Sequence, residues 1–283
     1  MQDVAHKLIL RGVLAGGLAG VLALVFARIV AEPQIQAAID YETGRDAAQA
    51  ALDHAAGLPS EPVADMDIFS RVAQATVGIG VGMVLFGVAM GALFAVVYTV
   101  CLGRVGTLRP RTLAVLVATG GFLGIYLVPF VKYPANPPSI GHAETIGARS
   151  GLYLLMVVCS VMFLVGAVWL GRWLQSRLGT WNASVVAGAA FVVAIGIVMG
   201  LLPSFGQLAA NVQQYGNQAT ETPLPLRNAA GVIVYPGFPA DVLFAFRLSS
   251  VATQLILWAT IGLVFAPLAD QLLTQHREAV SEV

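Results

Sequence analysis

Residues 150–171 read SGLYLLMVVCSVMFLVGAVWLG and contain no Asp, Glu, Lys or Arg. Crossing a hydrocarbon core of about 30 Å takes roughly 20 residues of helix, so this stretch is long enough to span a bilayer. It lacks the alternation of a barrel strand, and in lipid the backbone polar groups must be satisfied within the segment itself. The stretch therefore predicts a transmembrane helix.

Other stretches of the chain have the same apolar character. Counted together, six transmembrane helices are predicted, at about 10–31, 76–100, 112–131, 150–171, 183–202 and 249–268. Three longer connecting segments are expected to be outer loops, at about 32–75, 132–149 and 203–248. We therefore expect an all-α integral membrane protein, a bundle of about six transmembrane helices in a single membrane domain over residues 1–283.

The composition supports this class. Charged residues make up 11 % of the 283 residues, where a soluble chain carries about 25 %, and 58 % are hydrophobic. Mean hydropathy is +0.80. The 15 basic and 15 acidic side chains cancel, so no nucleic-acid partner is expected and the lipid bilayer is the surrounding medium. Cys101 and Cys159 lie in apolar runs without a CxxC partner, which argues against a disulfide framework or a thiolate metal site.

The distribution of charge predicts the orientation. The short connectors carry Arg104, Arg109, Arg111, Arg172 and Arg177, and basic loops are retained on the cytoplasmic side. Both termini are therefore expected in the cytoplasm. Eleven of the fifteen acids fall in the longer segments on the other side: Glu32, Asp40, Glu42, Asp46, Asp53, Glu61, Asp65, Asp67, Glu144, Glu221 and Asp241.

Similar residues recur at the ends of the predicted helices and suggest that the helices are paired. Each outbound helix is expected to end at or just before a proline, at Pro33, Pro134 or Pro203. An acid and then an arginine precede each returning helix, namely Asp65 and Arg71, Glu144 and Arg149, and Asp241 and Arg247. The pattern favours three in-out-in helical hairpins, while a 3+3 inverted repeat stays open as the alternative.

Glycines in the first apolar stretch form a small-residue ridge. Gly12, Gly16 and Gly20 are spaced four apart, a pattern that lets helix backbones approach closely in lipid. The ridge is predicted to be a packing seam, with an oligomer contact through the same residues as one use of it.

Charged groups at membrane depth are costly, so Arg28 and Glu32 are candidate site residues. Four residues apart at the end of the first helix, they share a face and can pair. An interfacial salt bridge and a place in a substrate path are equal alternatives.

Two proline-rich outer segments are further candidates. Residues 126–138 read YLVPFVKYPANPP; Pro129 removes a backbone hydrogen bond inside its helix, and Lys132, Tyr133 and Asn136 follow it. Residues 235–241 read YPGFPAD and place Asp241 at the start of the last apolar helix, where Gln254 is a candidate for a polar pathway.

The sequence shows no enzyme signature. The histidines, His6, His54, His142 and His276, have no metal-binding spacing, and GxSxG, GxxxxGK[ST] and HExxH are missing. We therefore expect no catalytic site, no bound cofactor and no enzyme activity.

The chain resembles the CbtA family, predicted cobalt transporter subunits of bacteria, over nearly its whole length. The resemblance rests on Arg11-Gly12 and the glycine-rich run to Glu32-Pro33, on the block PFVKYPANPP at 129–138 with ETIG at 144–147 and Arg149, and on FPAD at 238–241 with FRL at 246–248. The KYPANPP block is the specific part. The loop before Glu144 departs from the expected pattern, so His142 is not treated as a family ligand.

The resemblance implies a membrane subunit for cobalt uptake in the bacterial cytoplasmic (inner) membrane, linked to cobalamin supply. It also implies a small one-span partner, CbtB, with a histidine-rich end. Cobalt is then the transported substrate, and Glu32, Asn136, Glu144 and Asp241 are the expected cation path, since borderline Co²⁺ accepts oxygen ligands. Arg28, Lys132, Tyr133, Arg149, Arg247 and Gln254 are expected to line a polar pathway or to pair structurally.

Two alternatives stay open. The chain could carry another cation or a small anionic solute, which Lys132, Arg149 and Arg247 would attract. It could also be a non-conducting membrane scaffold, whose polar residues only shape the fold.

Overall fold

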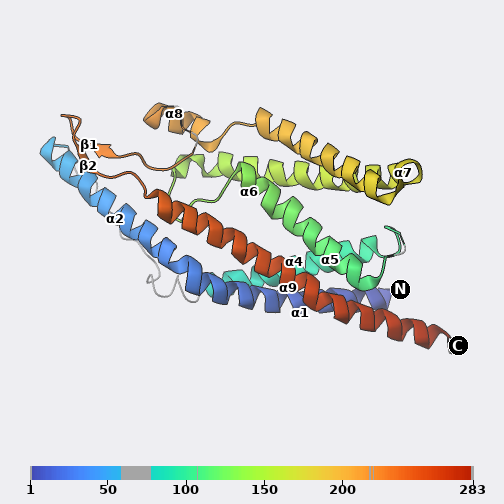
Figure 1. The fold of residues 1–283 in the computed structure, drawn as a ribbon. Coiled ribbons are helices and arrows are strands. Elements are labelled where there is room, and N and C mark those ends of the chain that lie inside the picture. Colours follow the sequence, from blue (N-terminus) through green and yellow to red (C-terminus); the bar gives the residue numbers. More distant parts are fainter. Residues whose placement is uncertain (1, 59–77, 107, 217, 219, 282–283) are drawn as a thin grey trace. The chain divides into compact units, whose positions relative to one another are not determined.

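The computed structural model describes residues 2–58, 78–106, 108–216, 218 and 220–281. Within them, five helices are long and apolar enough to cross a membrane, and one of these contains a turn that separates two apolar stretches. All six stretches predicted from the sequence are helical over their described residues, except for Leu202 at the end of the fifth. The expectation of an all-α membrane protein is confirmed (Figure 1). Glu61, Asp65, Asp67 and Arg71 lie outside the described residues.

The chain forms two compact units. Unit 1 consists of Met1–Pro33, Glu61–Phe122 and Leu248–Val283, and unit 2 consists of Gln34–Ser60 and Leu123–Arg247. The candidate residues divide between them, since Arg28, Glu32 and Gln254 belong to unit 1 and the proline-rich block belongs to unit 2.

Unit 1 is built from α1 (Gln2–Phe26), α4 (Ile79–Cys101), α5 (Pro110–Gly121) and the larger part of α9 (Ala240–Ser281). Its core is apolar and aromatic. Phe265 of α9 meets Phe94 and Tyr98 of α4 edge to face, with ring centroids 5.0 and 4.9 Å apart. Arg111 and Asp270 form an ion pair at 2.7 Å, which ties α5 to α9.

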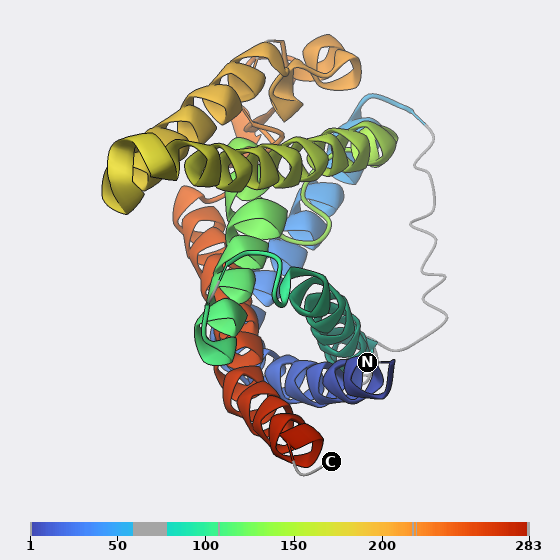
Figure 2. The ribbon, with the colours of Figure 1, turned by 90° about the vertical axis from the view of Figure 1, so that its right-hand side faces the viewer.

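The glycine ridge of α1 packs against α4 of the same chain. A Cβ added at Gly16 would lie 2.2 Å from the carbonyl oxygen of Gly87, and one added at Gly12 would lie 2.5 Å from that of Gly91. Figure 2 shows the two helices side by side. The packing seam is therefore present, and α4 of the same chain covers Gly12, Gly16 and Gly20. An oligomer contact through these glycines stays a prediction.

The sequence predicts that the first helix ends at or just before Pro33, but the helix continues past this residue. It passes through a π-helical turn, η1 (Ala27–Ala31), and continues as α2 (Glu32–Ala55). In η1 the amide of Glu32 donates to the carbonyl of Ala27, five residues back. This wider turn comes directly before the proline, whose ring would otherwise clash with the preceding helical turn. The first part of the expected outer loop 32–75 is therefore a helix.

A second π-helical turn also precedes a proline. The third apolar stretch runs through α5, η3 (Phe122–Leu127) and α6 (Val128–Lys132). Both π turns end two residues before the proline, at Ala31 before Pro33 and at Leu127 before Pro129. The helix thus accommodates Pro129, which removes a backbone hydrogen bond, by a wider turn that keeps the helix continuous.

Unit 2 contains a long helical hairpin, α7 (Ile146–Leu201), which turns at Gly179 with φ 72° and ψ 166°. The two limbs run side by side in Figures 1 and 2. They carry the apolar stretches 150–171 and 183–202. Met156 of the first limb and Ile195 of the second are both buried in one apolar cluster with Tyr133.

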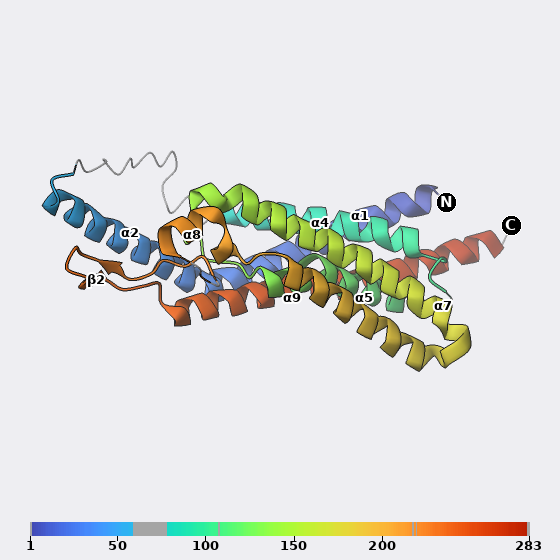
Figure 3. The ribbon, with the colours of Figure 1, turned by 90° about the horizontal axis from the view of Figure 1, so that it is seen from above.

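The remaining elements of unit 2 are short. They comprise η4 (Ala143–Thr145), η5 (Phe205–Gln207), α8 (Ala209–Tyr215) and a two-stranded antiparallel sheet of β1 (Leu226–Arg227) and β2 (Ile233–Tyr235). Figure 3 shows the sheet alongside α2. Tyr41 of α2 packs against Tyr235 and Phe238 there, which fixes the outer part of α2 to the rest of unit 2.

Candidate functional site

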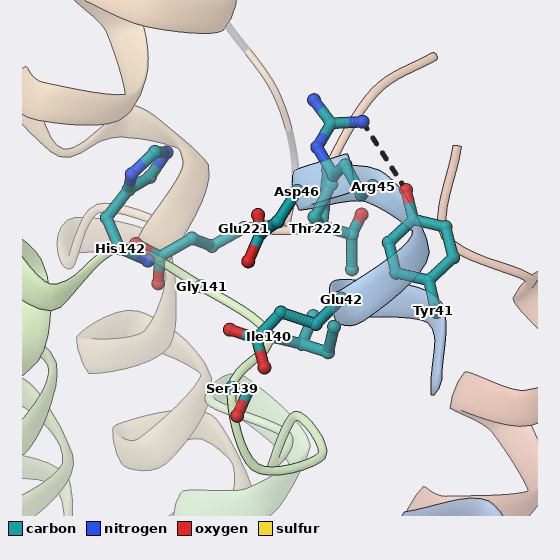
Figure 4. A pocket seen from close by; sticks show the side chains of 11 residues that line it. Tyr41, Glu42, Arg45, Asp46, Ser139, Ile140, Gly141, His142, Glu221 and Thr222 are labelled. Carbon is teal, nitrogen blue, oxygen red and sulfur yellow. Dashed lines mark hydrogen bonds between the residues drawn. The ribbon is translucent and has the colours of Figure 1, made fainter. Parts of the chain in front are cut away.

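A polar cavity of about 150 Å³ lies in unit 2 (Figure 4). Three segments line it: one face of α2, the loop that follows the proline-rich block, and the segment after α8. Its lining residues are Tyr41, Glu42, Arg45, Asp46, Ser139, Ile140, Gly141, His142, Glu221, Thr222 and Pro223.

The α2 face brings two carboxylates to the cavity. Glu42 and Asp46 are four residues apart and therefore share one side of the helix. Arg45 lies between them in the sequence, and its Nη1 donates to the carbonyl of Leu224 at 2.8 Å and to the hydroxyl of Tyr41 at 3.5 Å. These bonds hold the guanidinium of Arg45 at the wall of the cavity.

Glu221 supplies a third carboxylate, and it is only 2 % exposed. Its Oε1 accepts hydrogen bonds from the backbone amide of His142 at 3.1 Å and from the hydroxyl of Thr145. Its Oε2 lies 3.1 Å from Nε of Arg149 in a buried ion pair. A buried carboxylate needs such partners because an isolated buried charge is costly.

The loop between these groups has an unusual backbone. Ser139 has φ 68° and Gly141 has φ 131°, and L side chains rarely adopt either value. A Cβ at Gly141 would lie 2.8 Å from Nη1 of Arg149 and 3.3 Å from Oε2 of Glu221. Glycine at 141 thus lets the loop pack directly on the ion pair. Such strained positions cluster at functional sites.

The proline-rich block contacts the segment that carries Glu221. Nδ2 of Asn136 donates to the carbonyl of Glu221 at 3.0 Å, and Nη2 of Arg247 donates to Oδ1 of Asn136 at 2.9 Å. Nε of Arg247 also donates to the carbonyl of Ala135 at 3.1 Å. Asn136 therefore joins the start of α9 to the segment that carries Glu221.

Lys132 and Tyr133 attach the same block to the end of α7. Nζ of Lys132 donates to the carbonyl of Leu202 at 2.7 Å, and the hydroxyl of Tyr133 donates to that of Pro203 at 2.8 Å. Burial raises the pKa of Tyr133, which keeps its hydroxyl protonated as a donor. Both residues hold structure and do not line the cavity.

The other predicted site residues lie elsewhere. Arg28 and Glu32 pair at 3.2 Å within unit 1. Glu144 and Asp241 are exposed, in η4 and in the first turn of α9, and neither lines the cavity. Gln254 lines another cavity of about 150 Å³, in unit 1, with Met83 of α4 and Thr253.

From the sequence, Glu42, Asp46 and Glu221 are predicted only to be acids of the outer loops, and none of them is among the predicted site residues. The spacing of Glu42 and Asp46 on an alanine-rich stretch was a usable signal for one shared helix face. Glu221 gave no local signal, because its contacts come from residues 72 to 85 positions earlier in the chain.

The cavity is not built as a tight metal site. Among the described residues, no group of three or more His, Cys, Asp or Glu side chains is arranged to hold a metal ion. Glu42, Asp46 and Glu221 do line the same cavity, whose volume of about 150 Å³ leaves room for an ion with part of its water shell. Weak binding at several positions is what passage requires, since an ion must leave as readily as it enters.

Comparison with known proteins gives one informative result. No curated protein and no solved structure matches the chain. A family model described as "Probable cobalt transporter subunit (CbtA)" matches residues 5–270, nearly the whole chain. The resemblance carried by the glycine-rich first helix and the KYPANPP block is thereby confirmed. The chain belongs to the CbtA family of probable cobalt transporter subunits.

Proposed function

We propose that this chain takes up cobalt across the bacterial cytoplasmic membrane and so supplies cobalamin-related metabolism. The chain is the multi-pass subunit that carries the ion path, with both termini in the cytoplasm and without enzyme activity of its own. The family and the apolar helices support the class of function.

The acidic cavity carries the proposal. Glu42, Asp46 and Glu221 line one cavity in unit 2, and three carboxylates on one cavity attract a divalent cation. We assign this cavity as the outer vestibule of the path. Glu42 and Asp46 receive the hydrated ion, and Glu221 lies deepest.

The residues expected from the sequence take supporting places in this proposal. The exposed carboxylates of Glu144 and Asp241 raise the local concentration of cations outside the vestibule. Asn136 shapes the vestibule through its bond to the carbonyl of Glu221. Glu32, paired with Arg28, and Gln254, beside the other cavity, serve the part of the path in unit 1.

A partner completes the transporter, since the family consists of subunits. We propose a small one-span protein of the CbtB type. This chain offers four histidines in 283 residues, so a partner with a histidine-rich end would capture the metal and pass it on.

An anionic substrate is less well supported. Arg149 is paired with Glu221, while Lys132 and Arg247 donate to backbone carbonyls and to the side chain of Asn136. These three basic residues are therefore engaged with the protein and do not line the cavity.

The test is uptake of radiolabelled cobalt in cells that lack their own cobalt importers. The chain is expressed with and without its partner, and nickel and zinc are added as competitors. We expect saturable, cobalt-preferring uptake that falls at least tenfold in the double variant Glu42→Gln/Asp46→Asn, because the vestibule loses both outer charges.

Asp40→Asn is the matched control. Asp40 lies on the same helix, but it is exposed and bonded to Gln36, and it does not line the cavity. Uptake should change less than twofold. A well-expressed, membrane-inserted pair that accumulates no cobalt would overturn the uptake function. Equal losses in the double variant and in Asp40→Asn would show only a general charge effect and would overturn the assignment of the vestibule.

A further inference from the structure

We propose that the carboxylate of Glu221 exchanges its partner, bound to Arg149 when the vestibule is empty and to the transported divalent cation when it is loaded. This inference rests on the proposed function, because it requires a cation in the cavity. The vestibule alone does not imply this step, in which the guanidinium of Arg149 and the transported cation compete for Glu221.

The two oxygens of Glu221 are held differently. Oε1 is fixed by the amide of His142 and the hydroxyl of Thr145. Oε2 and Nε of Arg149 are buried and 3.1 Å apart, yet neither atom has a hydrogen-bond partner among the described residues. The ion pair is thus held by charge without an aligned hydrogen bond. Arg149 can therefore be displaced while the carboxylate keeps its orientation.

Charge balance makes the two partners mutually exclusive. A buried carboxylate without a counter-charge is strongly destabilising, so the empty protein needs Arg149 beside Glu221. A divalent cation at Oε2 supplies that counter-charge, and it repels a guanidinium only a few ångströms away. Binding of the cation therefore requires Arg149 to move from Glu221.

The other charged groups around the cavity come from α2. Glu42 and Asp46 remain as carboxylates for the outer side of the ion, and Arg45 stays bonded to Leu224 and Tyr41. Among the described residues, no hydrogen bond or ion pair joins any of these three to Arg149, whereas Nη2 of Arg149 donates to the carbonyl of His142 at 3.2 Å. Arg149 therefore has a second anchor, near the start of α7, when it leaves Glu221.

The decisive experiment is a calorimetric titration of the purified full chain in lipid nanodiscs with Co²⁺. In Arg149→Gln the competitor for Glu221 is gone, so we expect Co²⁺ to bind at least tenfold more tightly than to the wild type. A purely structural role for Arg149 predicts the opposite, since loss of the pair would disorder the site and weaken binding.

Arg45→Gln is the charge control, because it removes a positive charge that lines the same cavity without touching Glu221. Its effect should be no more than about threefold and should vanish at higher salt, as expected for a screened charge. The tightening in Arg149→Gln should persist at the same salt. Equal, salt-sensitive effects in both variants would overturn the exchange.

The double variant Arg149→Gln/Glu221→Gln is the control for misfolding, because it leaves neither charge buried without its partner. It should bind Co²⁺ at least tenfold more weakly than the wild type, and unchanged binding would overturn the proposal. Two results would instead overturn the assignment of the vestibule. The wild type could fail to bind Co²⁺, or its binding could be insensitive to Glu42→Gln/Asp46→Asn. Wild-type binding that Arg149→Gln leaves equal or weaker would refute the exchange alone.

Discussion

Gly16 and Gly17 are neighbours in the sequence, but their surroundings differ. A Cβ at position 16 would lie 2.2 Å from a backbone oxygen of α4, whereas one at position 17 would lie an ordinary 3.6 Å from a side-chain carbon of Val88. We expect Gly16→Ala to lower the free energy of unfolding by about 1–3 kcal/mol, because two backbones must separate. Gly17→Ala should be neutral or slightly stabilising.

Unfolding of both variants in mixed detergent micelles, followed by circular dichroism, measures this difference. The wild type and Gly17→Ala are compared at the same protein and detergent concentrations. Matching unfolding midpoints for all three proteins would contradict the close α1–α4 contact.

At the residue scale, prediction from sequence worked where the chemistry is local. Arg28 and Glu32 pair as expected, since they are four residues apart on one helix. Asn136 stood out because prolines surround it. Glu221 is not predictable in this way, because its burial and its long-range partners leave no pattern near position 221.

At the scale of elements, the turn of the α7 hairpin depends on one residue. Gly179 has φ 72° and ψ 166°, a conformation essentially confined to glycine. We expect Gly179→Ala to destabilise the protein by about 1–3 kcal/mol. The measurement is the shift of the thermal unfolding midpoint in micelles.

Gly166→Ala is the comparison within the same helix. Gly166 is exposed in the first limb, and an added Cβ would meet nothing within 4 Å. Alanine is a better helix former than glycine, so this variant should be at least as stable as the wild type. A loss of stability as large as that of Gly179→Ala would argue against the described turn.

The apolar stretches were predictable as helices because length and absence of charge suffice in lipid. Their ends were less predictable. Proline was expected to stop the first helix at Pro33, but a π turn precedes it and the helix continues to Ala55. A π turn leaves no mark in composition, so the sequence could not reveal it. The helical character of Asp46–Asp53, in contrast, follows from its alanines.

At the scale of the whole molecule, the proposed topology makes both ends of the chain cytoplasmic. Green fluorescent protein fused to the N-terminus or to the C-terminus should fluoresce, because it folds in the bacterial cytoplasm. Alkaline phosphatase fused after Gly57, beyond the end of α2, should be active because it requires the outer compartment. A fluorescent fusion at one terminus only would indicate an odd number of crossings.

The glycine seam has a consequence for biosynthesis. Gly87 follows Gly16 by 71 positions, so α1 enters the membrane well before its partner helix exists. At about 5–20 residues per second the interval lasts roughly 4–14 s. During it the ridge of α1 faces lipid and is open to any helix with a matching surface, including α1 of a second nascent chain. Slow synthesis of the segment that contains α4 would therefore favour misassembled dimers, joined through α1, over the native fold.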